Sequence, residues 1–109
     1  MRECVMTISR HWKGIAKPEE ADHYIHHLQN DTFPKLARIE GFIKASILRR
    51  PFGQGTEFLI ITTWQSVEAI RKFAGETADA AVVPPSVQAM MVEYDKEAAH
   101  YEVVEEYSP

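Results

Sequence analysis

The stretch of sequence that decides the fold covers residues 58–85 and reads FLIITTWQSVEAIRKFAGETADAAVVPP. It begins with a short apolar run that ends on Trp64, which is the pattern of a buried strand. Ser66 is a good helix N-cap, and Gly75 is a good C-terminal stop. Residues 67–74 between them are therefore predicted to form a helix. The stretch thus encodes a strand followed directly by a helix.

The start of the chain repeats this order of elements. Residues 5–12 alternate loosely between apolar and polar and end on Trp12, and Gly14 is expected to break the strand. Pro18 suits the first turn of a helix, and Pro34 is expected to kink it. The buried stripe of that helix has helical spacing and consists of Ala21, Tyr24, Ile25 and Leu28. Two strand-to-helix units, each joined at a tryptophan, predict a small duplicated βαβ domain.

The remaining elements complete a ferredoxin-like order. Residues 42–48 are typical of a second strand, and a turn-rich loop at 51–55 joins them to a third strand at 57–64. A short helix is expected after Pro85, from the helical spacing of Val87, Met90, Met91 and Tyr94. The last strand is expected at 99–107. The order β-α-β-β-α-(α)-β predicts an α+β fold, a four-stranded antiparallel sheet with helices on one face.

Apolar side chains face both ways along the third predicted strand. Phe58 and Ile60 point to one face of the sheet, whereas Leu59 and Ile61 point to the other. The helices can cover only one face, so the other face needs a cover of similar chemistry. A second copy of the same sheet is the simplest cover. The pattern therefore predicts a homodimer in which two sheets close face to face.

Size and composition fit a single globular domain over residues 1–109, because 45% of the 109 residues are apolar. The net charge of −4 and the scattered basic residues argue against nucleic acid or an anionic membrane as partners. No apolar run approaches the roughly 20 residues that span a bilayer. Residues 1–4 lead into strand pattern without a signal-peptide core. The single cysteine, Cys4, excludes an internal disulfide and fits a reducing compartment, so a cytoplasmic protein is expected.

Three histidines, His23, His26 and His27, cluster on the first predicted helix. His23 and His27 have the i, i+4 spacing at which two imidazoles can share a metal. On a helical wheel, however, His23 and His26 fall opposite the buried stripe, and His27 lies at its border. Since no cysteine is near and no third ligand is specified, a solvated helix face is the better interpretation. No metal site is expected.

Two polar residues lie where they could face a cavity. His100, at the start of the last predicted strand, could act as a general base, or it could be an ordinary strand histidine that hydrogen-bonds its neighbours. Arg10 and His11 lie on opposite faces of the first strand, so one of them must point toward any cavity under the helices. Arg10 there could hold an anionic group of a substrate, or it could pair with Glu40 or another carboxylate.

The large apolar residues at the strand ends allow two interpretations. Trp12 and Trp64 end matching strands, where an indole can wall a flat apolar pocket or plug the end of a barrel. Met90 and Met91 fit either a pliable pocket lining or the core stripe of the short helix. The sequence contains neither a Gly-rich phosphate loop nor a Gly-x-Ser-x-Gly motif. The residues alone therefore name no reaction.

The segment TWQSVEAIRKF at residues 63–73, together with EGF at residues 40–42, resembles the antibiotic-biosynthesis-monooxygenase-like family. The resemblance extends to residues 81–85 and 100–103, so it covers nearly the whole chain. It implies a ferredoxin-like subunit that pairs into a dimeric α+β barrel. It is more specific for fold than for activity, because the family is functionally mixed.

Some members of that family are cofactor-free oxygenases of polycyclic phenols and quinones, in which the carbanion of the substrate reacts with dioxygen. The resemblance therefore implies a small oxygenase that needs no cofactor and acts on an apolar, aromatic small molecule. His100 and His27 are the expected catalytic candidates, and the expected pocket lining is Trp12, Tyr24, Trp64, Phe73 and Met90. The alternatives are a non-catalytic binding or regulatory homodimer, and a structural dimer whose own side chains fill the cavity.

Other members degrade haem, with an asparagine on the first strand, a tryptophan in the second helix and a haem-ligating histidine shortly after it. The matching positions here are Ser9 or Arg10, then Phe73, then about Val83. None of these residues has the required side chain. The resemblance therefore does not extend to haem degradation of that type.

Overall fold

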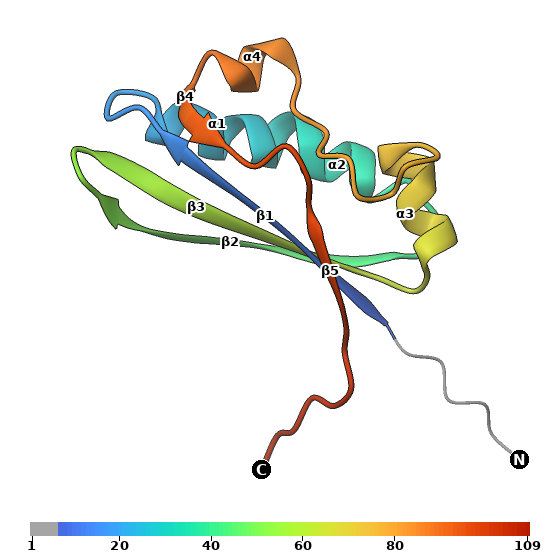
Figure 1. The fold of residues 1–109 in the computed structure, drawn as a ribbon. Helices are drawn as coiled ribbons and strands as arrows, with labels where there is room; N and C mark the ends of the chain where they lie inside the picture. The colour runs from blue at the N-terminus through green and yellow to red at the C-terminus, as the bar shows by residue number, and fades with distance from the viewer. Residues whose placement is uncertain (1–6) are drawn as a thin grey trace, which may run out of the picture.

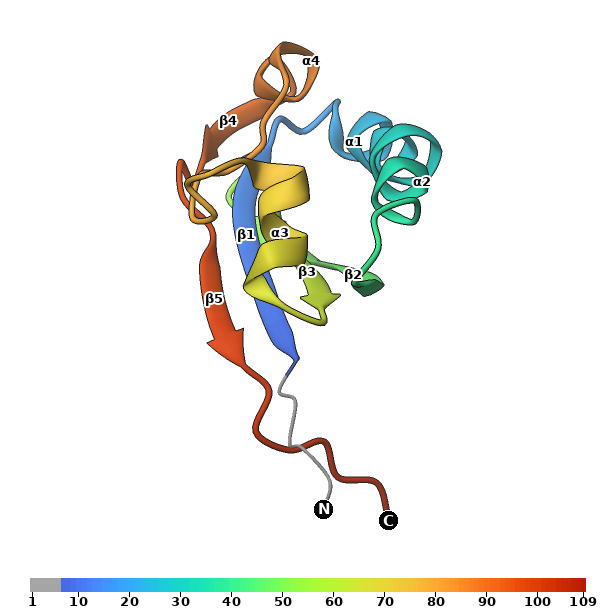
Figure 2. The same ribbon diagram turned by 90° about the vertical axis from the view of Figure 1, so that its right-hand side faces the viewer.

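The computed structural model describes residues 7–109, which form one antiparallel sheet with the helices on one side of it (Figure 1 and Figure 2). The strands are β1 (Ile8–Ala16), β2 (Phe42–Phe52), β3 (Gly55–Trp64), β4 (Met91–Tyr94) and β5 (Ala99–Glu102). The helical elements are α1 (Ala21–His27), the π-helix η1 (Leu28–Thr32), α2 (Phe33–Leu36), α3 (Val67–Ala74) and α4 (Pro85–Gln88). The α+β, ferredoxin-like arrangement expected from the sequence is confirmed.

The edge of the sheet beside β1 is formed by two short strands instead of one. The strand order is β2-β3-β1-β4, and β5 also pairs with β1. β4 pairs with residues 14–16 of β1, and β5 pairs with residues 8–11. Together they take the place of the single last strand predicted at 99–107, of which only residues 99–102 are strand. The sheet of the described residues therefore has five strands rather than the four expected.

The helix expected after Pro85 is shorter than its apolar spacing suggested. Only Pro85–Gln88 is helical, and Met91–Tyr94 form β4. Val87 and Met91 are both buried in the same core cluster, as their helical spacing predicts. They reach it from different elements, however, because Val87 lies in α4 and Met91 in β4. The unpaired backbone of β1 provides a strand partner at this point, and a backbone hydrogen bond from the Lys17 N–H to the Met90 carbonyl precedes the pairing.

Gly14 does not end the first strand, as the sequence suggested, but lies inside β1. A Cβ at this position would lie 2.6 Å from Cη2 of Trp12 and 3.1 Å from Sδ of Met91. The glycine therefore allows a close packing contact rather than a turn. As a result, Trp12 lies in the middle of its strand and not at its end. The first two residues of the predicted strand, and Cys4, lie outside the described residues.

The first helical region continues through Pro34 by changing its hydrogen-bond pattern. The N–H of Phe33 donates to the carbonyl of Leu28, five residues earlier, so residues 28–32 form a π-helix. Pro34 then lies in the first turn of α2, where its missing N–H is tolerated. Instead of the expected kink, the helical region has one wider, π-helical turn at this point. π-helical turns are frequent at functional sites, and this one borders the cavity described below.

The core lies between the sheet and the helices in two clusters. In one cluster, Tyr24 of α1 meets Phe58 of β3 edge to face, with ring centroids 5.0 Å apart. In the other, Trp64 packs with Ile70 of α3 and Leu36 of α2. The predicted helix over 67–74 and its caps are confirmed. The Ala69 N–H donates to Oγ of Ser66 at 3.1 Å, and Gly75 has a φ of 90°.

Replacing Gly41 with alanine is expected to lower the free energy of unfolding by about 1–3 kcal/mol. Gly41 has a φ of +100°, and an added Cβ would lie 2.5 Å from Cβ of Ala69 in α3. Gly53 is the control, because it also has a positive φ, +60°, but no atom lies within 4 Å of a Cβ there. Urea unfolding should show a clearly smaller loss for Gly53→Ala. Equal losses would mean that the contact with α3 contributes nothing.

Candidate functional site

A cavity lies between the helix-covered face of the sheet and the helical layer. Its enclosed space is about 70 Å³, and the space including its open mouth is about 580 Å³. The sheet, the helices and the loop after α3 all contribute side chains to it. The lining consists of Arg10, Trp12, Tyr24, His27, Leu28, Thr32, Phe33, Leu36, Ile60, Thr62, Phe73, Val82, Pro84 and Val87.

The walls of the cavity are largely apolar, and four aromatic rings contribute to them. The rings of Trp12 on β1 and Tyr24 on α1 lie with centroids 6.2 Å apart. Phe33 of α2 and Phe73 of α3 contribute two further rings to the lining. Burial raises the pKa of the Tyr24 phenol, so this hydroxyl stays protonated and is available only as a neutral hydrogen-bonding group. Such a lining suits a flat apolar or aromatic molecule.

Arg10 brings a buried positive charge to this lining. It is 4% exposed, and its guanidinium Cζ lies 5.6 Å from the centroid of the Phe73 ring. Nη1 donates to the carbonyl of Ala78 and contacts Nε2 of His100 at 2.8 Å, while Nη2 donates to the carbonyl of Ala80 at 2.8 Å. Arg10 thus fastens the loop after α3 to the sheet, and its partner is not Glu40.

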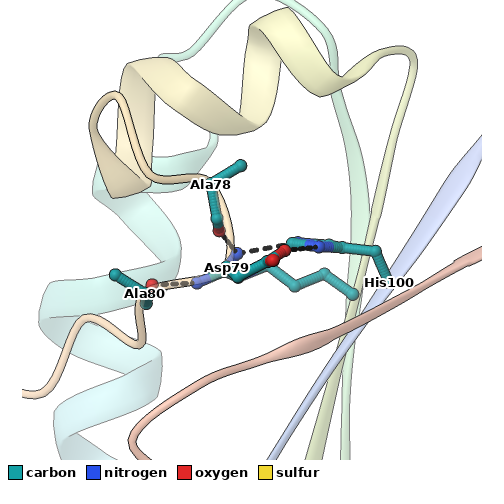
Figure 3. A network of polar contacts seen from close by, with 5 residues as sticks. Ala78, Asp79, Ala80 and His100 are labelled. Carbon is teal, nitrogen blue, oxygen red and sulfur yellow. Dashed lines mark hydrogen bonds and ion pairs between the residues drawn. The ribbon is translucent and has the colours of Figure 1, made fainter.

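His100 is not among the residues that line the cavity, and its Nε2 contacts Nη1 of Arg10. Figure 3 shows His100 beside Asp79 in this network of polar contacts. A guanidinium can only donate, so Nε2 of His100 must accept from Arg10. Nδ1 of His100 therefore carries the proton and donates to Oδ1 of Asp79 at 3.0 Å. This tautomer leaves His100 without a lone pair for a substrate. Of the two open interpretations of His100, a general base or a strand histidine hydrogen-bonded to its neighbours, the structure favours the second.

His27 is the histidine that lines the cavity. Its Nε2 atom is buried and makes no hydrogen bond to any described residue. The nearest anionic atom is Oδ2 of Asp31, one turn further along, at 3.8 Å. A buried polar nitrogen without a partner is uncommon and needs an explanation. Because His27 lines the cavity, a bound molecule that reaches this nitrogen would supply the missing partner.

Two residues expected in the lining lie outside it. Trp64 is completely buried behind Phe73, with the two rings stacked at 6.0 Å, and its indole N–H donates to Oγ1 of Thr62 at 2.9 Å. Met90 packs against the core cluster near α4 without reaching the cavity. Trp12, Tyr24 and Phe73 do line it. In this fold Trp64 is core, while the residues two and four before it on the strand, Thr62 and Ile60, face the cavity.

The other histidines of α1 lie in solvent, as the helical wheel indicates. His23 is exposed and contacts a carboxylate of Glu20 at 2.7 Å, and His26 is also exposed. Within residues 7–109, no three His, Cys, Asp or Glu side chains converge as metal ligands would. No helix in the described part of the chain is both long and apolar enough to cross a membrane.

The opposite face of the sheet carries a second, more open hollow, whose volume of about 560 Å³ compares with the 70 Å³ of the cavity under the helices. His11 and Tyr101 lie there with ring centroids 5.0 Å apart, and Leu48 and Leu59 pair across β2 and β3 beside them. Burial lowers the pKa of His11. No helix of the described chain covers this face (Figure 1).

The fold and the cavity define a class of small α+β domains with an apolar site under the helices. The chain belongs to the antibiotic biosynthesis monooxygenase family, whose model matches residues 12–83, well over half of the chain. A search of the curated proteins found no match.

Solved structures with low sequence identity share the fold. A heme-degrading protein from Mycobacterium tuberculosis is 17% identical with a TM-score of 0.60, over 97% of this chain and 100% of that one. SnoaB, a cofactor-independent oxygenase from Streptomyces nogalater, is 15% identical with a TM-score of 0.53, over 96% and 97%. A dimeric ferredoxin-like protein from an uncultured marine organism is 15% identical with a TM-score of 0.56, over 95% and 99%. At such identities these structures show the fold alone.

The residues present do not fit a haem ligated as in the haem-degrading members. Val83, at the position matched to their histidine, is a half-buried side chain packed against the core and has no ligating atom. Phe73, at the position matched to their tryptophan, stacks on Trp64. Arg10 is one of the two residues matched to the asparagine of those members, and it donates hydrogen bonds to the loop after α3. We derive no haem chemistry for this site.

Proposed function

We propose that this protein is a cofactor-independent monooxygenase that acts on a small aromatic molecule bound under the helices. The observation that carries the proposal is a largely apolar cavity, with four aromatic rings in its lining, whose lining also includes His27, a histidine with a buried Nε2 atom that has no hydrogen-bond partner among the described residues. Membership of the antibiotic biosynthesis monooxygenase family and the shared fold with an oxygenase that needs no cofactor support it.

The chemistry needs only a base and a dry site. Nε2 of His27 takes a proton from an activated C–H of a phenolic substrate, and the electron pair stays on the substrate as a carbanion. The carbanion reduces dioxygen, and a C–O bond forms; the proton returns from His27 to give a hydroperoxide. Loss of water then breaks the O–O bond and leaves a carbonyl. In sum, a methylene and dioxygen become a carbonyl and water, with no external reductant.

The small size of the cavity favours one competing function. Its enclosed space of about 70 Å³ is far below the roughly 300–1,000 Å³ typical of small-molecule sites. Unless the lining moves, the cavity takes at most part of a substrate. A non-catalytic binding or regulatory homodimer that holds a smaller metabolite is therefore the second candidate.

Oxygen uptake separates these two functions. The protein would be mixed with a panel of hydroquinones and of phenols that carry an activated methylene, alongside protein-free controls for autoxidation. The oxygenase predicts protein-dependent uptake and one labelled oxygen atom in the product under ¹⁸O₂. Saturable binding of a panel member without uptake would favour the binding protein instead. Neither binding nor uptake would favour a structural dimer.

We further propose that the protein is a homodimer that pairs through the open face of the sheet. On that face Leu48 is 43% and Tyr101 is 57% exposed, beside the half-buried Leu59 and Ile61. A second sheet would remove these apolar groups from water. The dimeric state named for one structural neighbour is in keeping with this arrangement. The cytoplasmic location remains a prediction from the single cysteine.

Replacing Leu48 with glutamate is expected to shift the dimer toward monomer. The substitution places a charge in the middle of the proposed interface, where it would be desolvated without a partner. Gln29→Glu adds the same charge on the exposed surface of η1, away from the open face, and should leave the dimer intact. Analytical ultracentrifugation at micromolar concentration measures both. A wild-type monomer, or a Leu48→Glu dimer as stable as that of the wild type, would contradict the proposed interface.

A further inference from the structure

The hydrogen bonds and the cation–π contact of Arg10 within the described chain all involve uncharged groups. They are the carbonyls of Ala78 and Ala80, the neutral His100 and the face of the Phe73 ring. None of the ion pairs of the described residues includes Arg10. The carboxylate of Asp79 contacts the imidazole of His100 (Figure 3), and no ion pair joins it to the guanidinium of Arg10.

The guanidinium also has unused donors. An arginine has five N–H groups in a fixed fork. Ala78, Ala80 and His100 take three of them, which leaves two without a partner among the described residues. Because Arg10 lines the cavity, a molecule bound there can contact the side chain that carries these donors.

A buried cation without an anionic partner is unfavourable in apolar surroundings. Burial lowers the pKa of Arg10, and the charge of Asp79 opposes this effect. An oxygen anion that reaches the two remaining donors would compensate the charge and form charge-assisted hydrogen bonds. The aromatic side chains of Trp12 and Tyr24 line the same cavity and suit a ring attached to that anion.

We propose that Arg10 is the anion-binding residue of this cavity, and that the cavity selects an aromatic molecule with one anionic oxygen at the edge of its ring, a carboxylate or a phenolate. The proposal rests on the proposed function in that it concerns the same cavity and names its substrate class. His100 is a positioning residue, because its Nε2 accepts a hydrogen bond from Nη1 of Arg10 and so fixes the orientation of the guanidinium. In an oxygenase, the same contact would stabilise the deprotonated substrate more than the neutral one.

Matched probes test this selectivity without turnover. Benzoate and 4-nitrophenolate carry the anionic oxygen, and benzamide and 4-nitroanisole are their neutral counterparts of similar shape. Titration followed by NMR, with the Trp12 indole N–H and the Arg10 Nε–H as reporters, gives the four affinities. We expect each anion to bind about tenfold more tightly than its neutral counterpart. Equal affinities within each pair, or no binding by any probe, would overturn the proposal.

Substitutions at Arg10 separate recognition from structure. Arg10→Gln should reduce the ratio of anion to neutral affinity to about one, and Arg10→Lys should retain part of it. A purely structural role, in which Arg10 only fastens the loop after α3, would weaken both members of each pair equally. A ratio that survives in Arg10→Gln overturns the proposal. If neither variant folds, the ratios of anion to neutral affinity measured for the wild type still test the proposal.

The result of this binding experiment does not depend on whether the protein is an oxygenase. Selective anion binding without oxygen uptake would leave Arg10 as the anion site of a binding protein. Oxygen uptake with no preference for the anionic probes would support the oxygenase and remove the role of Arg10.

Discussion

Replacing Trp64 with alanine is expected to lower the free energy of unfolding by about 3–5 kcal/mol. Trp64 is completely buried between the end of β3 and α3. Its ring meets Phe42 edge to face at 5.3 Å and stacks on Phe73 at 6.0 Å. Removing the indole leaves a cavity and also takes the hydrogen-bond donor away from Thr62. Folded domains of this kind are stable by only about 5–15 kcal/mol, so the loss is a large fraction of the total.

Trp64→Phe is the matched variant because it keeps a ring in the core. It removes the indole N–H and part of the volume, so we expect a smaller loss, of about 1–2 kcal/mol. Urea unfolding at one fixed protein concentration compares the three proteins, since dimerisation would make stability depend on concentration. A loss below about 1.5 kcal/mol for Trp64→Ala would mean that the site collapses around the smaller side chain.

The sequence was most informative where several local signals agreed. Around α3, an apolar run, a serine cap, an amphipathic stripe and a glycine stop all indicate the same boundaries, and the structure has them. The buried stripe of the first helix was equally clear, since Tyr24 and Leu28 are buried as predicted. These features depend on residues close together in the chain, which a pattern can report.

The errors arose where a distant partner decides the structure. Met91 has helical spacing from Val87, yet it joins a strand because the edge of β1 is free to pair there. Gly14 is typical of a strand end, yet it continues β1 because the Trp12 ring covers it. Neither β1 edge pairing nor that packing contact is visible in a local window.

The candidate site was predictable in kind but not in detail. The alternation along β1 placed either Arg10 or His11 toward the cavity, and the structure places Arg10 there and His11 on the open face. The sequence could not show that His100 accepts a hydrogen bond from Arg10, because the two residues are 90 positions apart. That single contact leaves His27 as the remaining candidate base of the two expected from the sequence.

Replacing His27 with glutamine is expected to reduce protein-dependent turnover by about 10²–10⁴-fold, which is the usual contribution of a positioned general base. Glutamine keeps a polar group of similar reach at the border of the cavity but cannot take a proton at neutral pH. Steady-state oxygen uptake, with whichever phenol of the panel the wild type accepts, measures the loss.

His26→Gln is the control for this prediction, because His26 lies next to His27 on α1 but is exposed. It should turn over at the wild-type rate. The affinity of His27→Gln for benzoate should stay within about threefold of wild type, since the anion site is at Arg10 and not at His27. A large loss of turnover with retained affinity would identify the unpartnered nitrogen as the proton acceptor. Full turnover in His27→Gln would mean that the substrate loses its proton to water, so that stabilisation of its anion by Arg10 would be the main contribution of the protein to the reaction.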